Sequence, residues 1–418
     1  MSLPSPRSFQ PGPRGRIDAL RRSGRTTRYA THARAHHRKE FGHGPLPLVH
    51  RSAGLRRSRL DTRRLGRTDL EIPALVLGTM ARRNASDAER TALFRAAIDA
   101  GLTAIDTAPL YGFGEADRQL GACLRQLPRG QVQILSKVGL RWDDDHGDVL
   151  FAFHDAEGHR RQVRKDSRPV SVRRDVEATL ARLGVETLDL VQIHHPDLQV
   201  PIAESMGELL RLRDEGKLRH IGVSNFSVAQ IEAAQEALGD VPLCSVQQDY
   251  SLVRRRIEAE VLPACRRLAI GVLAYSPLAE GVLSGRAIDP RQPGLAPIQD
   301  AITQRLLPLA RAHGTTPVAI ALAWLIAQPG VTAAITGASS TAQLQEQIPA
   351  LTIRLAEGEL KLLTDAFART PLPYGWEAPG RGLRGGLRRG RALAGRLARR
   401  IGLDPAALRR KPVHRRND

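Results

Sequence analysis

The stretch TAIDTAPLY (103–111) combines a strand pattern with two groups that can do chemistry. It opens as a short β-branched and apolar run and reaches a carboxylate at Asp106. Pro109 then breaks the segment, and a phenol follows at Tyr111. A buried strand that ends in Asp and passes into a Pro-containing loop places a carboxylate and a weak acid at one rim of a sheet. The other strands decide which partners reach that rim.

Short apolar runs with strand character recur along the chain from residue 62, and helical patterns separate them. The predicted strands are 75–79, 103–106, 133–137, 188–193, 220–224, 244–248, 272–275 and 332–335. The predicted helices are 87–100, 116–127, 171–183, 202–214, 228–238, 258–268, 304–313, 317–327, 341–348 and 357–367. This alternation predicts an α/β fold of one domain, a closed (β/α)8 TIM barrel. A doubly wound open sheet is the alternative, but LVLGTM (75–80) has one glycine where the dinucleotide-binding turn needs three.

Two long segments interrupt the alternation, and both would lie at the carboxyl ends of the strands. Residues 139–170 are charged and carry Trp142 with two phenylalanines, whereas residues 279–297 are rich in Gly and Pro. Both are predicted to be loops, which at this length are functional or disordered. Trp142 is a candidate to line a substrate pocket, with a packing anchor as its structural alternative.

The formal net charge of +20 is concentrated at the two ends of the chain. Residues 1–60 hold 14 Lys and Arg against two acids, and residues 371–418 hold 13 against three. The predicted barrel domain, 61–370, is therefore nearly neutral. We expect both basic tails to be disordered. The first sixty residues also fit a wrongly assigned start of translation, and their composition leaves an organelle-targeting peptide open.

The cysteines and the acidic residues do not indicate a metal site. Cys123, Cys244 and Cys265 lack metal-ligand spacing, so they are predicted to be structural thiols in a reducing compartment, the cytoplasm. The acidic run 143–145 is predicted to be a solvated turn, because no His or Cys cluster accompanies it. No apolar run is long enough to cross a bilayer, so we expect no membrane association.

Four reactive groups stand at the ends of consecutive predicted strands: Asp106, Tyr111, Lys137 and His194. Active sites of such barrels are built on that face from several strands. A phenol has an ordinary pKa of about 10, and an adjacent ammonium lowers it. We expect Lys137 to do this for Tyr111, Asp106 to keep Lys137 charged, and His194, neutral or cationic, to polarise a carbonyl oxygen. The set suits proton donation to a carbonyl oxygen while hydride arrives at carbon.

Each of these residues also has a structural interpretation. Asp106 could cap a helix, Tyr111 could line a rim, Lys137 could end a solvated strand, and His194 could be a satisfied core histidine. Four such coincidences would have to fall at successive strand ends, so the joint pattern favours catalysis. His195 is left out, because alternation along a continuing strand would point it away from His194.

Five motifs that occur in order resemble the aldo-keto reductase family. They are DTAPLYG (106–112), ILSK (134–137), QIH (192–194), GVSNF (222–226) and AYSPL (274–278). The resemblance spans roughly residues 62–368 and is most similar to bacterial general-stress members and aldose dehydrogenases. It implies reduction of aldehydes or ketones with NAD(P)H, or aldose oxidation in reverse. It places the family's catalytic tetrad on Asp106, Tyr111, Lys137 and His194, with Tyr111 as the proton donor and Tyr111, His194 and Trp142 facing the substrate.

The same resemblance implies where the cofactor binds. Ser224, Asn225 and Gln247 would hold the nicotinamide carboxamide, and Tyr275 would stack on the nicotinamide ring. Residues 276–281 would wrap the pyrophosphate, and residues 335–347 would bind the adenosine end of the cofactor. The implied cofactor-binding residues are Gly78, Thr79, Asp106, Ser224, Asn225, Gln247, Tyr275, Ser276, Leu278, Gly281, Gly337, Ser339, Gln343 and Gln347.

This chain departs from many relatives at the adenosine end. Gly337, Ser339 and Gln343 stand where a basic residue often pairs with the 2′-phosphate, and Gln347 stands where Asn is common. Arginine recognises phosphate bidentately, so its absence weakens a strict preference. We expect NADP, with NAD as the alternative. A second departure, Ala-Asp in place of a Ser-Glu pair within 114–117, is expected to alter a helix start rather than the chemistry.

Two other functional classes stay open from the sequence. The barrel also resembles the β subunits of potassium channels, a cofactor-sensing regulatory class, and the basic tails would suit a nucleic-acid-associated protein. We expect an enzyme that acts on a small carbonyl or sugar substrate, with no metal, membrane or specific nucleic-acid partner. The sequence determines neither the substrate nor the oligomeric state.

Overall fold

The computed structural model describes residues 61–80, 85–127, 130–154, 159–288, 293–370 and 372. The predictions made for residues 1–60 lie outside the described residues, and so do those made for 371–418 apart from Leu372. The division into a barrel domain and two tails therefore stays a prediction.

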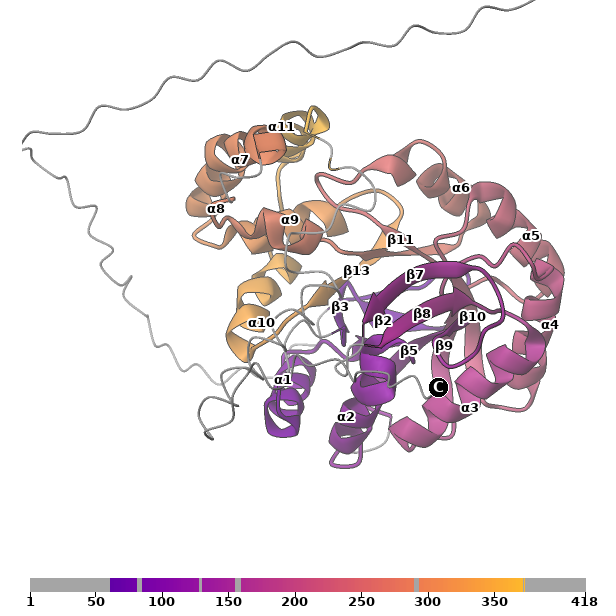
Figure 1. Cartoon of the computed structure of the whole chain (residues 1–418). Helices are drawn as coiled ribbons and strands as arrows, with labels where there is room; N and C mark the ends of the chain where they lie inside the picture. Colours follow the sequence, from indigo (N-terminus) through magenta and orange to yellow (C-terminus); the bar gives the residue numbers. More distant parts are fainter. Residues whose placement is uncertain are drawn as a thin grey trace, which may run out of the picture. The chain divides into compact units, whose positions relative to one another are not determined.

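Eight parallel strands close into a barrel, as the sequence predicts (Figure 1). They are β3 (Leu75–Gly78), β4 (Ala104–Asp106), β5 (Gln133–Val138), β9 (Leu188–Ile193), β10 (Leu218–Ser224), β11 (Ser245–Asp249), β12 (Gly271–Tyr275) and β13 (Val331–Gly337). Each strand pairs with the next along the chain within the barrel, and β13 pairs with β3 to close it. The carboxyl ends of all eight strands therefore open onto one face.

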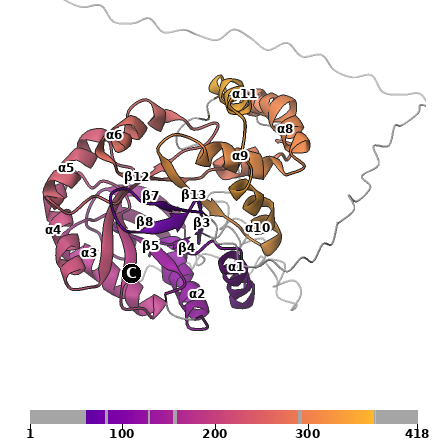
Figure 2. The same cartoon turned by 180° about the vertical axis from the view of Figure 1, so that it is seen from behind.

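The helices surround the barrel, and each of them except α7 overlaps a predicted segment (Figures 1 and 2). They are α1 (Asp87–Asp99), α2 (Glu115–Leu124), α3 (Pro169–Leu183), α4 (Ile202–Asp214), α5 (Val228–Leu238), α6 (Val261–Leu268), α7 (Ala296–Ala301), α8 (Leu307–Ala312), α9 (Pro317–Ile326), α10 (Thr341–Gln347) and α11 (Glu357–Ala368). Helix α3 starts before the predicted Ser171, because Pro169 has a backbone angle suited to the first helical turn, where its missing N–H costs nothing.

A short hairpin that the sequence pattern does not predict lies at the amino end of the barrel. Its strands are β1 (Thr62–Arg64) and β2 (Glu71–Pro73). Leu65 and Ile72 are fully buried with the inward-facing residues of the barrel strands. A Cβ at Gly271 would come within 2.4 Å of Leu65 Cδ1, so only glycine lets the hairpin pack this closely against β12.

The segment 139–170 is not the loop that the sequence predicts. It forms a three-stranded antiparallel sheet of β6 (Leu140–Arg141), β7 (Val149–His154) and β8 (Arg160–Lys165), in the order β6-β8-β7. Figure 1 shows β7 and β8 crossing in front of the barrel strands. Its small core consists of Leu140, Phe153 and Val163. The prediction failed because β6 has two residues and β8 has one apolar residue, so the apolar run of β7 has no recognisable partner strand in the sequence.

The second predicted loop, 279–297, contains 3-10 turns, η3 (Ala279–Ser284) and η4 (Pro293–Leu295). Helix α7 already begins at Ala296, ahead of the predicted start at 304, and a π-helical turn, η5 (Ile302–Leu306), joins it to α8. Figure 1 shows α7, α8 and α11 in one group beside α9, and Figure 2 shows α8 and α11 side by side from behind. No single helix in the described ranges is long and apolar enough to span a membrane; 296–312 and 317–326, bent by 90°, pass that test only as a pair.

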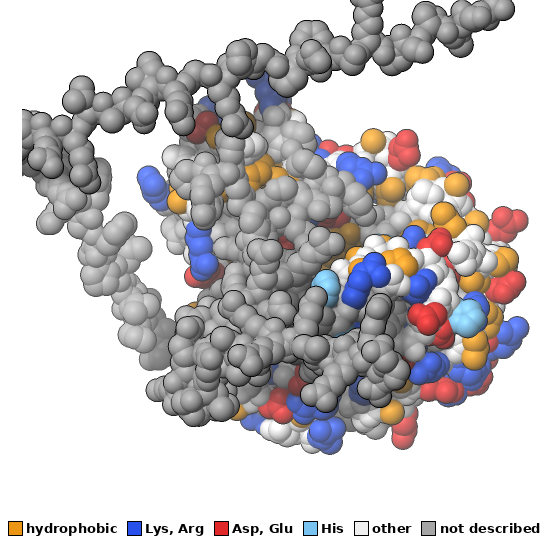
Figure 3. Space-filling view, viewed as in Figure 1, with side chains coloured by type: hydrophobic (Ala, Val, Ile, Leu, Met, Phe, Trp, Pro, Cys, Tyr) orange, Lys and Arg blue, Asp and Glu red, His pale blue; other side chains and the backbone are white. Residues whose placement is uncertain are grey.

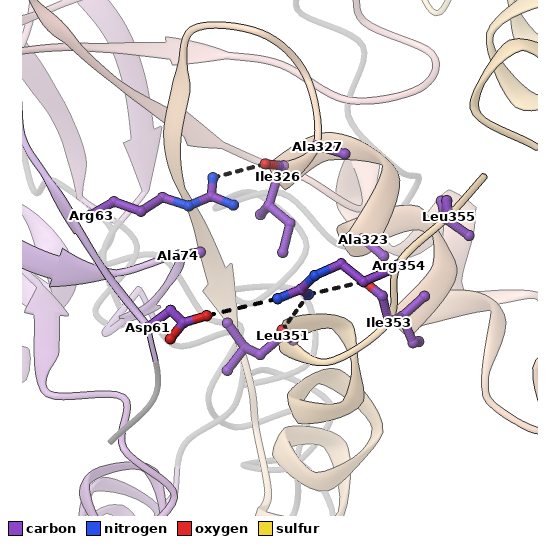
Figure 4. A pocket seen from close by; sticks show the side chains of 10 residues that line it. All are labelled: Asp61, Arg63, Ala74, Ala323, Ile326, Ala327, Leu351, Ile353, Arg354 and Leu355. Atoms are coloured by element: carbon purple, nitrogen blue, oxygen red, sulfur yellow. Dashed lines mark hydrogen bonds and ion pairs between the residues drawn. The ribbon is translucent and has the colours of Figure 1, made fainter. Parts of the chain in front are cut away.

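A cavity of about 270 Å³ lies at the amino ends of the barrel strands (Figure 4). Arg63 crosses one side of it and donates to the backbone carbonyl of Ile326 at 2.8 Å. Arg354 faces Asp61 across the opening at 3.8 Å. Because the predicted reactive groups lie at the carboxyl ends of the strands, this cavity is separate from them.

Charged residues of both signs are interspersed on the described surface. On the face drawn in Figure 3, coloured Lys and Arg side chains alternate with Asp and Glu. Several exposed Arg residues are also paired, as Arg118 is with Asp87 at 2.8 Å. Such exposed pairs contribute little to stability, about 0–1 kcal/mol each.

A buried ion pair anchors the three-stranded sheet to the barrel. Arg141 in β6 is 5% exposed and donates to Asp175 in α3, which also accepts the backbone N–H of Gly139 at 3.0 Å. Asp143, which is partly exposed, is the second acceptor for Arg141.

We expect Asp175→Ala to lower the free energy of unfolding by about 3 kcal/mol, because Arg141 then lacks its buried counter-charge and keeps only Asp143. Urea unfolding of the full chain measures the change. The exposed Asp145→Ala is the control and should shift the stability by less than about 0.5 kcal/mol. Equal midpoints for the two variants would contradict the anchoring role of the pair.

Candidate active site

The structure brings the four predicted reactive groups to one end of the barrel. Asp106 ends β4, Lys137 lies near the end of β5, and His194 directly follows β9. Tyr111 opens the 3-10 turn η1 (Tyr111–Gly114), where Gly112 and Phe113 adopt φ of 62° and 56°. β4 pairs with β5 and β5 with β9, so the groups stand on neighbouring strands.

Lys137 is the centre of this cluster. Its side chain is 0% exposed, and its Nζ donates to Asp106 Oδ1 at 2.5 Å and to Tyr111 Oη at 3.0 Å. The backbone carbonyl of Thr107 is a third acceptor at 3.3 Å. The ammonium therefore has three acceptors, as an ion removed from water requires. This geometry matches the predicted arrangement, in which Asp106 contacts Lys137 and Lys137 contacts Tyr111.

Burial changes the acid-base properties expected of this pair. Burial lowers the pKa of Lys137, but Asp106 and Tyr111 raise it by more, so the ammonium stays charged. The pKa of Tyr111 is raised by burial, although Lys137 lowers it, as expected. The expected effect of Lys137 on the phenol pKa is therefore confirmed, but burial, which the sequence does not reveal, outweighs it. Burial destabilises the phenolate by more than one adjacent ammonium stabilises it.

His194, which follows β9, contacts the ring of Tyr111. The two rings meet edge to face with their centroids 5.9 Å apart. Burial, together with the nearby positive charge of Lys137, holds the pKa of His194 well below its usual range. Of the two states that the sequence allowed, the structure therefore favours the neutral imidazole.

His195 does not point away from His194, contrary to the prediction. The two rings stack with their centroids 5.5 Å apart and an interplanar angle of 20°. Strand β9 ends at Ile193, so the alternation of a strand no longer applies to the pair. His195 Nε2 lies 3.3 Å from Asn225 Nδ2, and burial lowers the pKa of His195 to about 4.

The residues predicted to hold the nicotinamide converge on the same end of the barrel. Gln247 donates to Asp106 Oδ2 at 3.0 Å. Asn225 donates to Ser224 Oγ at 3.0 Å and to the carbonyl of His194 at 2.9 Å, and it accepts from the Tyr275 hydroxyl at 2.8 Å. Asn225 has φ 64°, a left-handed conformation that asparagine tolerates better than most residues.

Gly78 ends β3 and Thr79 follows it, so both stand beside Asp106 across the β3–β4 pair. A Cβ at Gly78 would come within 3.1 Å of Ile335 Cγ2, a tight contact that the isoleucine side chain would have to relieve by a small shift. Thr79 donates to the Thr107 hydroxyl at 3.0 Å.

The residues predicted for the rest of the cofactor lie after β12 and β13. Ser276 has φ 51° and donates to Glu280 at 3.1 Å, and the turn from Leu278 continues through Gly281 at φ 87°. Gln343 accepts the Ser339 N–H at 2.8 Å, and Gln347 donates to the carbonyl of Gly337 at 3.0 Å.

Gln347 provides a test of whether a nucleotide fits. The side chain is 3% exposed, and its Oε1 is buried without a hydrogen-bond partner among the described residues. A buried unpaired carbonyl oxygen is costly unless a ligand donor reaches it. No heavy atom lies within 4 Å of a Cβ built on Gly337 beside it. This segment therefore fits the adenine end of a nucleotide.

Trp142 lies beside the site rather than against Tyr111. It packs on Phe113, with ring centroids 5.3 Å apart, and Phe113 stacks on Phe153 at 5.0 Å. Phe113 is 42% exposed and Leu110 packs against the same cluster, so aromatic groups flank Tyr111. Phe113 is not among the residues that the sequence predicts for the site, and its only signal there is its place two residues after Tyr111.

Within the described ranges, no group of three or more His, Cys, Asp or Glu side chains is arranged to hold a metal ion. Cys123, Cys244 and Cys265 are buried and unpaired, and burial raises the pKa of each thiol. These thiols therefore fit the predicted packing role.

The model of the aldo/keto reductase family matches residues 74–367, which contain every residue of the candidate site. The chain belongs to this family. It is 32% identical to a probable aldo-keto reductase 1 of Glycine max over 76% of this chain and 90% of the relative. It is also 32% identical to the NADH-specific methylglyoxal reductase of Escherichia coli K12, over 72% of this chain and 96% of that one.

Solved structures agree with the family assignment. The glycerol dehydrogenase of Gluconobacter oxydans superposes with a TM-score of 0.65 at 31% identity, covering 76% of this chain and 99% of the other. A thermostable aldo-keto reductase in complex with the inhibitor epalrestat has a TM-score of 0.59 at 30% identity, covering 73% and 99%. The protein is therefore an oxidoreductase that uses a nicotinamide cofactor to reduce aldehydes or ketones to alcohols.

Asp106→Asn should leave Lys137 as a buried ammonium without its counter-charge and lower the free energy of unfolding at neutral pH by about 3–5 kcal/mol. The pKa of Lys137 then falls below that of an unfolded lysine, because burial dominates. The folded variant binds the proton less tightly than the unfolded chain, so its stability rises toward about pH 10. In the wild type, where the pKa is raised, this contribution is instead lost as the pH rises through it.

Urea unfolding at several pH values measures the difference, with the exposed Asp145→Asn as the control. A deficit of Asp106→Asn that stays constant between neutral and alkaline pH would show that Asp106 does not hold the charge of Lys137.

Proposed function

We propose that Tyr111 donates the proton to the carbonyl oxygen, with Lys137 and Asp106 as its electrostatic support and His194 as a second hydrogen-bonding group. The observation that carries this proposal is the buried chain from Asp106 through Lys137 to the Tyr111 hydroxyl, with contacts of 2.5 and 3.0 Å. A phenol with a raised pKa stays protonated at neutral pH, so it can give a hydrogen bond to a bound carbonyl.

A nicotinamide cofactor supplies the hydride when it is bound. Ser224, Asn225 and Gln247 would hold its carboxamide, and Tyr275 would lie against its ring. The turn 276–281 and the segment 337–347 would bind the pyrophosphate and the adenosine. Gln247 also contacts Asp106 in this structure, which would couple the nicotinamide pocket to the proton donor.

Each side chain of the site has a different role in the reduction of the carbonyl group. Lys137 stabilises the negative charge that forms on the Tyr111 oxygen as its proton leaves, and Asp106 keeps Lys137 charged. The neutral His194 offers a hydrogen bond without adding a second buried charge beside Lys137. Asn225 fixes the backbone carbonyl of His194 and so holds the histidine loop in place.

The substrate is proposed to be a small carbonyl compound or a sugar. Two relatives are named for methylglyoxal and for glycerol, which are small and polar. The exposed Phe113, with Trp142 behind it, adds an apolar side to the mouth of the site. The direction of the reaction in the cell depends on which substrate is supplied. Oxidation of an aldose is the reverse of the same hydride transfer. Nothing in the family match favours a channel-type regulatory subunit.

Tyr111→Phe should lower the rate of carbonyl reduction by about 10²–10⁴-fold while cofactor binding stays unchanged, because only the proton donor is lost. Turnover of methylglyoxal and an aldehyde panel, followed by nicotinamide absorbance, gives the rate; quenching of tryptophan fluorescence gives cofactor affinity. Tyr250→Phe is the matched control, because its hydroxyl contacts Glu258 in the core at 2.6 Å. Full turnover in Tyr111→Phe would refute the assignment.

We propose NADP as the cofactor on the family resemblance, with NAD as the alternative that the residues at the adenosine end support. Residues 331–347 contain no Lys or Arg that could pair with a 2′-phosphate. The Ser339 N–H already donates a hydrogen bond to Gln343. One relative is NADH-specific by name. The kcat/KM values with NADPH and NADH decide between the two.

Ser339→Arg should raise the preference for NADPH over NADH by about tenfold or more, because a guanidinium can bind the 2′-phosphate bidentately. Ser339→Gln is the matched control of similar length without the charge. A preference that does not differ between these two variants would place the 2′-position elsewhere.

A further inference from the structure

Asp117 is a buried carboxylate beside the candidate site, for which the sequence predicted only a change at a helix start. Its side chain is 0% exposed, and the N-cap of α2 is Gly114, with no side-chain capping bond. Asp117 Oδ1 instead accepts the Thr107 hydroxyl at 2.7 Å. Its Oδ2 accepts Nε and Nη2 of Arg182, each at 3.0 Å. The carboxylate therefore joins the residue that follows β4 to α2 and α3.

Thr107 connects Asp117 to the reactive cluster. Its backbone carbonyl accepts from Lys137 Nζ at 3.3 Å, and its backbone N–H donates to Leu135 at 2.8 Å. Its hydroxyl accepts from Thr79 at 3.0 Å while it donates to Asp117. Thr107 is 0% exposed, so no water can replace these partners without opening the barrel mouth. Asp117 thus fixes the residue that provides one of the three acceptors of Lys137.

Arg182 supports the turn that carries Tyr111. A Cβ at Gly114 would come within 2.9 Å of Arg182 Cδ, and Gly114 has φ 92°. Arg182 Nη2 also donates to the buried Thr179 hydroxyl at 3.0 Å, which locks the guanidinium against α3. The turn from Tyr111 to Gly114 therefore rests directly on the partner of Asp117.

We propose that Asp117 is a positioning residue: with Arg182 it fixes Thr107 and the turn 111–114, and so keeps Lys137 and Tyr111 in hydrogen-bond contact. This inference rests on the proposed role of Tyr111 as proton donor. The charged groups that face Asp117 are Arg182 and, at longer range, Lys137. Burial raises the pKa of Asp117, and its hydrogen bonds oppose that shift.

Two substitutions test the link from its two ends. Thr107→Val keeps the size and the charge but removes the hydroxyl, and Asp117→Asn breaks the ion pair with Arg182. We expect both to lower kcat roughly ten- to a hundredfold while KM stays unchanged, because a displaced donor costs rate rather than binding. In Thr107→Val the Tyr111 phenol should also titrate at a higher pH, since Lys137 no longer stabilises the phenolate as closely.

Glu208→Gln is the matched control for loss of stability. Glu208 in α4 is 4% exposed and pairs with Arg173 of α3 at 2.6 Å and with Arg211 of its own helix at 2.8 Å, so its ion pairs lie outside the candidate site. It should lower the melting temperature as the two test variants do, yet keep kcat and the titration of Tyr111. If Thr107→Val and Asp117→Asn match Glu208→Gln in melting temperature, in kcat and in the titration of Tyr111, the positioning role is refuted.

The titration of Tyr111 separates this inference from the proposed function. It is read as the difference in tyrosinate absorbance between each protein and its Tyr111→Phe counterpart, so it needs no turnover. A wild-type protein that reduces no carbonyl would refute the proposed function alone. An unchanged Tyr111 titration in Thr107→Val would refute the positioning role even if the enzyme is active.

Discussion

The buried ion pair between Lys137 and Asp106 is the interaction on which the site depends. An ammonium that is 0% exposed is tolerable only because Asp106, Thr107 and Tyr111 all accept from it. These acceptors come from β4 and the loop after it, so the pair exists only when β4 and β5 are neighbours in the closed barrel. The fold and the chemistry are thereby linked, because loosening this strand pair would separate the buried ammonium from its acceptors.

Burial acts on the other two groups in a coordinated way. It raises the pKa of Tyr111 and lowers that of His194, so both are uncharged hydrogen-bonding groups around one retained ammonium. A second cation at His194 would be repelled by Lys137, and a ground-state phenolate at Tyr111 would leave no proton to give. The site therefore keeps a single positive charge where negative charge develops on oxygen during carbonyl reduction.

Family membership establishes carbonyl reduction with a nicotinamide cofactor. Residues that differ from those common in relatives give this chain its own features. The segment 331–347 has no cation for a 2′-phosphate, yet it leaves Gln347 Oε1 buried and open to a ligand donor. The Ala-Asp pair at 116–117 looked like a change of helix start, but Asp117 reaches the reactive cluster through Thr107. Such substitutions gain their meaning from what they contact, which an isolated motif does not show.

The sequence by itself determined the eight strands, most helix boundaries and the set of Asp106, Tyr111, Lys137 and His194, because strand and helix periodicity and strand-end position are local properties. Only the tertiary structure decided three further features: the sheet of 139–170, the side on which His195 lies, and the direction of the Tyr111 pKa. Each depends on burial or on pairing with distant residues, such as Asp175 with Arg141, and these partners meet only after the barrel closes.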